Sequence, residues 1–409
     1  MSFLLKHDNK FFSKYFEISG SKSISNRLLI LKYLYKNINI ENLSDSDDTL
    51  VLKSCLEKNL TKIDISHAGT AMRFLTAYLS IKENQEFEIT GSERMKKRPI
   101  KILVDSLRNL GARIHYLEEK GYPPLKIIGK KIDGGEIVLD STISSQYISA
   151  LILIASVLKK GLKIYLKGTL ISRPYVTMTL SILSKLGIKN TFRNKIISIK
   201  SFQKIKKTNF KVESDWSSLS YYYCIIAFSK NSKINVGNFY EKSLQGDKKL
   251  VNIYSKFGVE TKFLKNEGRL ILSKNKDYKV PIKINIDLVE NPDIAQTVII
   301  TCFGLGISCE ITGLQTLKIK ETDRLQAMKN ELRKLGADVE ITKNSLHLSP
   351  IEKINKNISI NTYNDHRMAM AFSPLAMLVP ITINNPEVVT KSYKNFWKDL
   401  KAINFNISG

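Results

Sequence analysis

The segment KIKETDRL at positions 318–325 combines proton-transfer groups with anion-binding groups. Apolar residues recur at helical spacing from Leu325 to Leu335, so a helix begins here, and Thr322 is its expected N-cap. Glu321 is a carboxylate that can move a proton, while the lysines and the arginine can hold an anion. A solvated first helical turn is the simpler interpretation of this segment taken alone, but the chain builds similar helix starts elsewhere.

A repeated pattern organises the chain. A helix, then Leu-Gly or Phe-Gly, then a strand recurs around Gly111, Gly187, Gly258 and Gly336. Glycine just past a helix end suits a left-handed C-terminal cap, and alternating residues such as 337–341 are typical of a strand. These features predict α/β units of about 70 residues each.

The helices come in pairs. The first members are expected to begin near Ser23, Gly69, Ser144, Asp215, Pro292 and Asn364, and the second members near Ser46, Pro99, Pro174, Asp247, Thr322 and Ser392. Six such units are too many for one compact domain, so we divide them into two groups of three near Lys211. Only 46 residues separate the first two starts, which suggests that the first unit lacks a piece or takes it from elsewhere.

These helix starts carry serines, arginines, lysines and carboxylates. Helix N-termini present free N–H groups and partial positive charge, and arginine offers a fork matched to phosphate or carboxylate. The expected ligand is therefore a polyanion containing both groups. Each residue also has a structural alternative: the serines can be simple caps, Arg27 and Arg73 can be structural ion pairs, and His366 can be a hydrogen-bonding residue rather than a metal ligand.

Composition and missing motifs exclude several classes of function. The 409 residues are 43% hydrophobic and 25% charged, as in a soluble globular protein, and no apolar run reaches the ~20 residues of a membrane helix. No removable leader is expected, and four cysteines without zinc or redox spacing predict a reduced, cytoplasmic protein. No Walker loop, GxGxxG, HExxH or GxSxG segment is present, so metal, nucleotide and acyl-enzyme chemistry are unsupported.

Several motifs together resemble one known family. SGSKSISNR, AGTAMR, RMKKRPI, SSQ, SRPY, KETDR, YNDHRMAMAF and the late Lys391 occur in the order found in the 5-enolpyruvylshikimate-3-phosphate (EPSP) synthases, from Ser19 to about Leu400. The resemblance implies an α/β enolpyruvyl transferase fold with two similar domains, each of three βαβαββ units around a pseudo-threefold axis. The expected domains are residues 20–212, and residues 1–19 with 213–409, which close on an active-site cleft between them.

The resemblance also implies the reaction. The family transfers the enolpyruvyl group of phosphoenolpyruvate to the 5-hydroxyl of shikimate 3-phosphate by addition and elimination, and releases phosphate. This is a step of the shikimate pathway towards chorismate and the aromatic amino acids. We expect a cytoplasmic monomer that uses no metal or organic cofactor and binds neither nucleic acid nor membrane.

Site residues carried over from the family fall into three sets. Asp293 resembles the proton acceptor for the 5-hydroxyl, Glu321 the proton donor to the methylene carbon, and Lys22 a further group in proton transfer. The residues expected to bind shikimate 3-phosphate are Lys22, Ser23, Arg27, Ser144, Ser145, Gln146, Ser172, Tyr175, Asp293 and Lys320. Those expected to bind phosphoenolpyruvate are Lys22, Gly69, Arg94, Gln146, Arg324, Arg367 and Lys391.

The sequence departs from the family pattern at a few positions. His67 stands where asparagine is usual, Phe74 where proline often follows the arginine, and Trp216 where a small residue is common. Thr316 replaces a frequent substrate-binding asparagine and could weaken a substrate contact. Gly69 should leave room for glyphosate, which predicts a sensitive enzyme, although Phe74 could reshape the surrounding helix.

Two alternatives compete with this assignment. The sister enzyme, UDP-N-acetylglucosamine enolpyruvyl transferase, shares the fold but carries a reactive cysteine on a loop where this chain has Ser92–Pro99 and no cysteine. A nucleic-acid-binding repeat protein would explain the net charge of +26. It would need lysines on one face with exposed aromatics, whereas the cluster Tyr221–Tyr223 lies in an apolar helix and is expected in the core.

Overall fold

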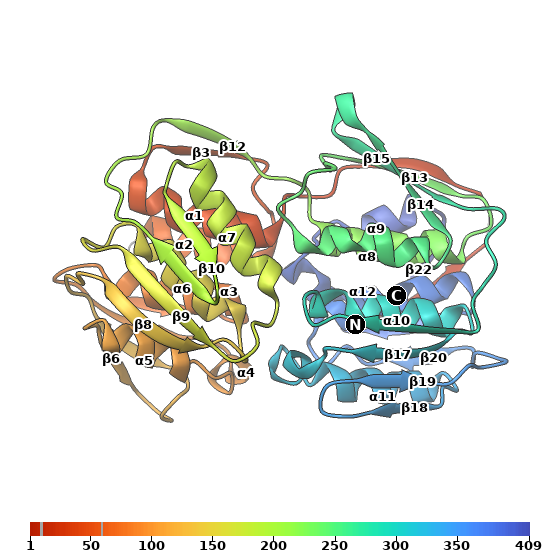
Figure 1. The fold of residues 1–409 in the computed structure, drawn as a ribbon. Coiled ribbons are helices and arrows are strands. Elements are labelled where there is room, and N and C mark those ends of the chain that lie inside the picture. The colour runs from red at the N-terminus through yellow and green to blue at the C-terminus, as the bar shows by residue number, and fades with distance from the viewer. Residues whose placement is uncertain (9–10, 59) are drawn as a thin grey trace. The chain divides into compact units, whose positions relative to one another are not determined.

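The computed structural model describes residues 1–8, 11–58 and 60–409. The chain forms two compact units (Figure 1). One contains Gly20–Val212, and the other joins Met1–Ser19 to Glu213–Gly409. Each unit is built from repeats in which strand, helix, strand, helix and a closing β-hairpin follow one another, as the resemblance implied.

Two complete repeats lie in Gly20–Val212. Each makes a four-stranded sheet in the orders β4-β5-β7-β6 and β8-β9-β11-β10, with the first two strands parallel and the hairpin antiparallel. Their elements are β4 (Lys62–Asp64), α3 (Gly69–Ser80), β5 (Glu86–Thr90), α4 (Glu93–Lys96), α5 (Lys101–Asn109), β6 (Arg113–Tyr116), β7 (Leu125–Ile128), β8 (Gly135–Asp140), α6 (Ser145–Ala155), β9 (Leu162–Lys167), α7 (Arg173–Lys185), β10 (Asn190–Arg193) and β11 (Ile196–Ile199).

The first repeat is incomplete, which explains its short interval. It consists of α1 (Lys22–Tyr35), β3 (Ile38–Glu41) and α2 (Asp47–Lys58), and its sheet has two strands. The second strand is β12 (Thr208–Lys211), which pairs in parallel with β3 although it lies at the far end of the unit's sequence. The repeat therefore lacks a hairpin and takes one strand from elsewhere, as the sequence suggested.

The second unit contains three four-stranded sheets. Their elements are α8 (Trp216–Phe228), β13 (Lys233–Gly237), η1 (Gly246–Lys249), α9 (Leu250–Ser255), β14 (Val259–Leu264), η2 (Lys265–Glu267), β15 (Arg269–Lys274), β16 (Lys283–Asp287), η3 (Pro292–Ile294), α10 (Ala295–Gly304), β17 (Ser308–Thr312), η4 (Gln315–Ile319), α11 (Arg324–Lys334), β18 (Val339–Ile341), β19 (Leu346–Leu348), β20 (Ile358–Ile360), α12 (His366–Phe372), η5 (Ser373–Met377), β21 (Ile381–Asn384), η6 (Pro386–Lys391), α13 (Phe396–Lys401) and β22 (Phe405–Ser408). The elements named η are short 3₁₀ helices.

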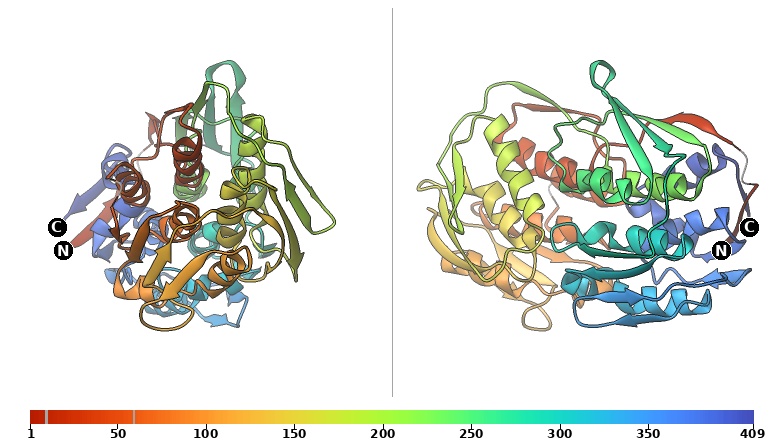
Figure 2. Two further views of the ribbon diagram at one scale, coloured as in Figure 1. Left: turned by 90° about the vertical axis from the view of Figure 1, so that its left-hand side faces the viewer. Right: turned by 45° about the vertical axis from the view of Figure 1, so that its right-hand side comes forward.

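The N-terminal segment completes two of these sheets. β1 (Ser2–His7) lies between β21 and β22 and is antiparallel to both, so the two ends of the chain lie side by side (Figure 2). β2 (Ser13–Phe16) pairs in parallel with β13. The start of the chain is thus held by main-chain hydrogen bonds to segments hundreds of residues away.

Helices that are apolar on all sides form the interior of this second unit. α8 packs against α10, and Tyr221, Tyr222 and Tyr223 are all buried, which confirms their assignment to the core. The four cysteines are reduced and buried, as expected. No helix among the described residues is long and apolar enough to cross a membrane.

Two expected helix starts were wrong in detail. Asp323, not Thr322, caps α11, because its carboxylate accepts the backbone N–H of Gln326 and also complements the helix dipole. The last helix begins at Phe396 rather than near Ser392, which follows the short helix η6.

Candidate active site

The starts of α1, α3 and α6 lie side by side in Gly20–Val212. The Gln146 amide, at the start of α6, donates to the hydroxyl of Thr70 at the start of α3, at 3.2 Å. Arg27, one turn into α1, donates to the hydroxyl of Ser149, one turn into α6, at 3.1 Å. Three helix N-termini and their side chains are therefore gathered in one place, which concentrates N–H donors and positive potential.

Arg27 is one of the buried cations of this group. It is 2% exposed, and it donates to the hydroxyls of Thr179 and Ser149 and to the carbonyls of Ser23 and Tyr175. All of these acceptors are uncharged. Burial lowers the pKa of Arg27 to about 10, which leaves it charged at neutral pH. A buried charge held by uncharged acceptors favours an anionic ligand.

Phe74 supports this cation from the neighbouring helix. The Arg27 guanidinium carbon lies 5.4 Å from the centre of the Phe74 ring, within the range of a cation–π interaction. Phe74 is one of the positions at which the sequence departs from the family pattern. The ring therefore takes part in holding a proposed substrate-binding residue.

Lys22 and Gly69 occupy the first positions of α1 and α3. The Lys22 ammonium lies 3.2 Å from the Asp48 carboxylate of α2, so it is oriented by a neighbour that the sequence analysis did not single out. A Cβ atom on Gly69 would lie 2.5 Å from a guanidinium nitrogen of Arg98. Arg73 donates to the Gly69 carbonyl at 3.2 Å and the Pro99 carbonyl at 3.0 Å, and so joins the helix start to the RMKKRPI segment.

The serines have mixed roles. The Ser144 hydroxyl caps α6 by accepting the Gln146 N–H, which is the structural alternative considered for it. Ser172 precedes α7 with φ of 55° and makes no capping hydrogen bond through its side chain. A non-glycine residue at positive φ stores strain, and such strain is often found at functional positions.

Arg324 is the centre of the site in the other unit. Its Nε atom donates to Asp365 at 2.7 Å, one terminal nitrogen to Asp293 at 3.1 Å, and the other to Glu321 at 2.8 Å. Its side chain is 2% exposed. Burial opposes the charge, but the three carboxylates outweigh burial and hold the pKa of Arg324 above its usual range.

Asp293 lies among cations from three elements. Its carboxylate is 3.4 Å from the Lys320 ammonium, 3.1 Å from Arg324 and 3.8 Å from Arg367. Burial would raise its pKa, but Lys320, Arg367 and Arg324 together hold the pKa of Asp293 well below its usual range. The carboxylate is therefore ionised and weakly basic while these cations face it.

Glu321 forms a second group with Lys391. Their charged atoms lie 3.0 Å apart, and both side chains are largely buried. Because Arg324 also binds Glu321, the two candidate proton-transfer carboxylates share one guanidinium. The arrangement joins these two carboxylates and four cations, Lys320, Arg324, Arg367 and Lys391, in one ion-pair network within one unit.

The start of α12 completes this group. Asp365 caps the helix by accepting the Arg367 N–H at 2.9 Å, and Arg367 also donates to the Ser217 hydroxyl at 3.4 Å. His366 is buried, 3.5 Å from Asp365, in keeping with a structural role. Among the described residues, no group of histidine, cysteine and carboxylate side chains could hold a metal ion.

The structure thus gathers the expected site residues into two sets. Asp293, Lys320, Glu321, Arg324, Arg367 and Lys391 form one ion-pair network. Lys22, Ser23, Arg27, Gly69, Ser144, Ser145, Gln146, Ser172 and Tyr175 lie at the helix starts of the other unit, while Arg94 is in α4. Sequence reasoning missed the ion pairs of Asp48 and Asp365, although Asp365 lies within the NDHR motif that it used.

Comparison with solved structures identifies the class of fold. An EPSP synthase from Acinetobacter baumannii matches with a TM-score of 0.79 and 21% identity over 100% of both chains. A second structure of EPSP synthase from that organism gives 0.78 and 20%. These two similarities confirm the two-domain enolpyruvyl transferase fold class.

Sequence comparison narrows the class to a family. The family model described as EPSP synthase (3-phosphoshikimate 1-carboxyvinyltransferase) matches residues 52–400. An enzyme of that name from Bacteroides fragilis (strain YCH46) is 43% identical over 395 residues, 96% of this chain and 95% of the relative. Another from Buchnera aphidicola subsp. Cinara cedri is 37% identical, with 94% of each chain covered. The chain belongs to the EPSP synthase family.

Family membership confirms the recognition made from the motifs. It also confirms that the chain is an enolpyruvyl transferase of the shikimate pathway. The two competing assignments, the sister UDP-sugar enzyme and the nucleic-acid-binding protein, are not favoured.

Proposed function

We propose that this protein transfers the enolpyruvyl group of phosphoenolpyruvate to the 5-hydroxyl of shikimate 3-phosphate and releases phosphate. The observation that carries the proposal is the guanidinium of Arg324, which forms ion pairs with both Asp293 and Glu321 and so holds the two carboxylates in one network. The reaction requires a base, an acid and positive groups that bind two phosphates and carboxylates, and this network offers a candidate base, a candidate acid and part of the positive groups.

In the proposed mechanism, Asp293 removes the proton of the 5-hydroxyl while the oxygen attacks C2 of phosphoenolpyruvate. Its low pKa makes it a weak base before substrates bind. Anionic substrates would pair with Lys320, Arg367 and Arg324, reduce their effect on Asp293, and so raise its pKa towards a useful range. Substrate binding would thereby activate the base.

Glu321 is the proposed acid. It donates a proton to C3 of phosphoenolpyruvate as the C2–O bond forms, which gives a tetrahedral intermediate with a methyl group. Glu321, now a carboxylate, takes a proton back from that methyl group as phosphate departs from C2, which restores the double bond. The proton first accepted by Asp293 leaves with the phosphate. Lys391, at 3.0 Å from Glu321, stabilises the carboxylate after it has given up its proton. Lys22 is a further candidate for proton transfer.

The helix starts of Gly20–Val212 are the proposed remainder of the substrate site. Arg27, with its uncharged acceptors, suits a substrate carboxylate or phosphate. Ser23, Ser144, Ser145, Gln146, Ser172 and Tyr175 are assigned to shikimate 3-phosphate together with Lys22, Asp293 and Lys320. Gly69, Arg94 and Gln146 are assigned to phosphoenolpyruvate together with Lys22, Arg324, Arg367 and Lys391.

Neither unit contains the complete set of these groups. We therefore propose that residues 20–212 form one domain, residues 1–19 and 213–409 the other, and that the substrates bind in a cleft between them. Closure of such a cleft would exclude water from the tetrahedral intermediate.

We also propose that the protein is a cytoplasmic monomer that needs no cofactor and binds no nucleic acid. Reduced, buried cysteines are consistent with the cytoplasm. The buried tyrosine cluster of α8 offers no stacking surface to nucleic acid bases, despite the net charge of +26.

The test is phosphate release from the purified protein. Release should require both substrates, and it should fall by about 10²–10⁴-fold in Glu321→Gln and in Asp293→Asn, the range typical of lost acid–base catalysis. Circular dichroism should show both variants folded. A folded wild-type protein that releases no phosphate with both substrates present would overturn the proposal.

A further inference from the structure

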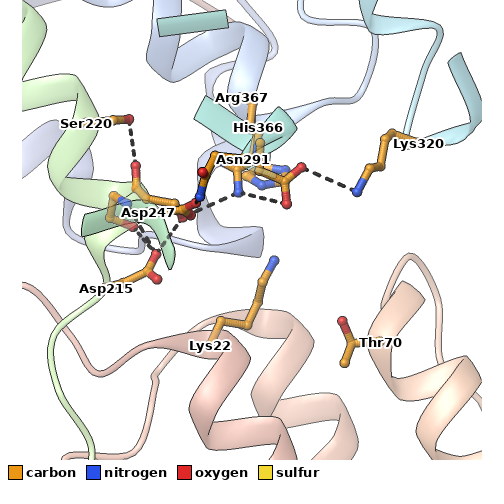
Figure 3. Close-up of polar contacts among 12 residues, drawn as sticks. Lys22, Thr70, Asp215, Ser220, Asp247, Asn291, Lys320, His366 and Arg367 are labelled. Atoms are coloured by element: carbon orange, nitrogen blue, oxygen red, sulfur yellow. Dashed lines mark hydrogen bonds and ion pairs between the residues drawn. The ribbon is translucent and has the colours of Figure 1, made fainter. Parts of the chain in front are cut away.

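Asp247 is a buried carboxylate that contacts the segment carrying the proposed base. It lies in η1, and its Oδ1 atom accepts a hydrogen bond from the Asn291 side-chain amide at 2.9 Å (Figure 3). Asn291 is the residue immediately before the short helix η3, which contains Asp293. Asp247 therefore contacts the segment that carries the base without belonging to it.

Asn291 anchors that segment. Its backbone N–H donates to the Leu288 carbonyl at 2.9 Å, and its own carbonyl accepts the Ile294 N–H at 3.3 Å, so the turn folds around it. Its side chain is buried, and the amide oxygen has no hydrogen-bond partner among the residues that the structure describes. The amide is thus held by its Nδ2 donation to Asp247.

Among the described residues, the charged groups with the largest effect on Asp247 come from three elements. They are Asp215 at the start of α8, Asp293 in η3 and Arg367 in α12. Two helices, α8 and α9, pack against η1. Neither helix contains a lysine, an arginine or a carboxylate. In η1 itself, Lys248 donates to the Glu241 carbonyl and Lys249 pairs with Glu290 at 3.8 Å. Burial, opposed by the Asn291 hydrogen bond, raises the pKa of Asp247 to about 6.

We propose that Asp247 is a positioning residue for the reaction: in its ionised form it holds the Asn291 amide, and through it the turn that presents Asp293. This inference rests on the proposed role of Asp293 as the proton acceptor. A charge-assisted hydrogen bond is roughly twice as strong as a neutral one, so an ionised Asp247 orients the amide firmly.

Protonation of Asp247 exchanges the donor and the acceptor in its hydrogen bond with Asn291. A carboxylic acid has a donor of its own, and the unsatisfied amide oxygen of Asn291 is a suitable acceptor for it. The amide would then rotate to present its oxygen to Asp247 and the geometry of the turn would change. Protonation also removes a negative charge close to Asp293, which makes Asp293 a weaker base. Both effects lower the rate on the acid side.

The test compares pH–rate profiles of wild type and Asp247→Asn at saturating substrates between pH 5 and 8.5. We expect a kcat several-fold lower in the variant at pH 8, and a wild-type to variant ratio that decreases as the pH falls and Asp247 becomes protonated. Substrate phosphates also titrate near pH 6, but their ionisation cancels in the ratio because both enzymes use the same substrates.

Glu213→Gln is the matched control. Glu213 is another buried carboxylate of the same unit with a raised pKa, but it accepts hydrogen bonds from Trp216, Ser243 and Gln245 rather than from Asn291. Its wild-type to variant ratio should stay constant with pH. A pH-independent ratio for Asp247→Asn, or the same pH change for Glu213→Gln, would overturn the inference.

A second variant keeps the test independent of folding defects. Asn291→Ala should lower kcat more than it changes the KM for either substrate. Its effect should not add to that of Asp247→Asn, because one variant removes the donor of this hydrogen bond and the other removes the charge of its acceptor. Additive effects would contradict the inference. If Asp293→Asn keeps the wild-type rate, the proposed function of Asp293 fails; if it loses activity while the Asp247 ratio stays flat, the positioning role alone fails.

Discussion

The two units hold their buried arginines in opposite ways. Arg27 is surrounded by hydroxyl and carbonyl acceptors and by an aromatic ring, whereas Arg324 is bound by three carboxylates. The first arrangement leaves a positive charge for an incoming anion to neutralise. The second is already paired with carboxylates, and together with Lys320 and Arg367 it holds the pKa of Asp293 well below its usual range. Under the proposed function, the first unit supplies an unneutralised cation for an anionic substrate. In the second unit, an anionic substrate would offset the cations around Asp293 and raise the pKa of that carboxylate.

Loss of Arg324 should have the largest effect. In Arg324→Met, three carboxylates would lose a shared cation, and removal of one partner from a buried ion pair typically costs about 3–5 kcal/mol. We expect a clear fall in the denaturant midpoint together with loss of turnover. Unchanged stability would show that the network is not needed for folding.

Arg27→Met should have a different effect from Arg324→Met. The acceptors of Arg27 are hydroxyls and carbonyls, so its removal does not leave a buried carboxylate unpaired. The KM for shikimate 3-phosphate should rise by about 10²-fold, while stability should change by about 1 kcal/mol or less. Steady-state kinetics and denaturant unfolding measure the two effects separately. Strong destabilisation without a change in KM would assign Arg27 a purely structural role.

Asp247 provides a test of how the ionisation of a buried carboxylate in the second unit changes the stability of the folded state. Its pKa is raised from the ordinary 3.8 to about 6, so the folded state binds this proton more tightly than the unfolded state does. The favourable contribution is complete below about pH 4 and is lost as the pH rises through about 6.

Asp247→Asn should therefore be more stable than wild type at pH 8, by up to about 3 kcal/mol, and no more stable near pH 4. Thermal unfolding at both pH values checks this. A gain of stability that is the same at both pH values would show that the effect is not one of ionisation.

Gly69→Ala is the mildest expected change. The new Cβ would lie 2.5 Å from the end of the Arg98 side chain, which can shift to accommodate it. We expect a KM for phosphoenolpyruvate about 10-fold higher and weaker inhibition by glyphosate, because the new methyl group would fill the space beside Gly69 that the family resemblance assigns to glyphosate. Serine at a solvent-facing site, such as Asn84→Ser, should change neither value.

Much of this site could be predicted from the chain because the relevant signals are local. Glycines after helices and alternating strands mark the repeats, and the motif segments contain the residues that the structure gathers at the two sets of helix starts. Asp323 displaced Thr322 as the cap because neighbouring residues compete for the same backbone N–H, and the outcome depends on backbone angles at that turn.

The exchange of strands between repeats was less visible. β12 pairs with β3, β2 with β13, and β1 inserts between β21 and β22. A strand's own sequence reports that one face is buried, but not which distant strand it joins. The short first interval was the only local sign that the first repeat was incomplete.

The sequence by itself determined where the first helix of each of the six units begins, the repeat architecture and the family, because periodicity and short motifs depend on neighbouring residues. Only the tertiary structure decided how the charges combine. Arg324 joins carboxylates at positions 293, 321 and 365, and Asp247 meets Asn291 across 44 residues. The pKa of each group then follows from burial and from those partners, which are set by packing in space rather than by order along the chain.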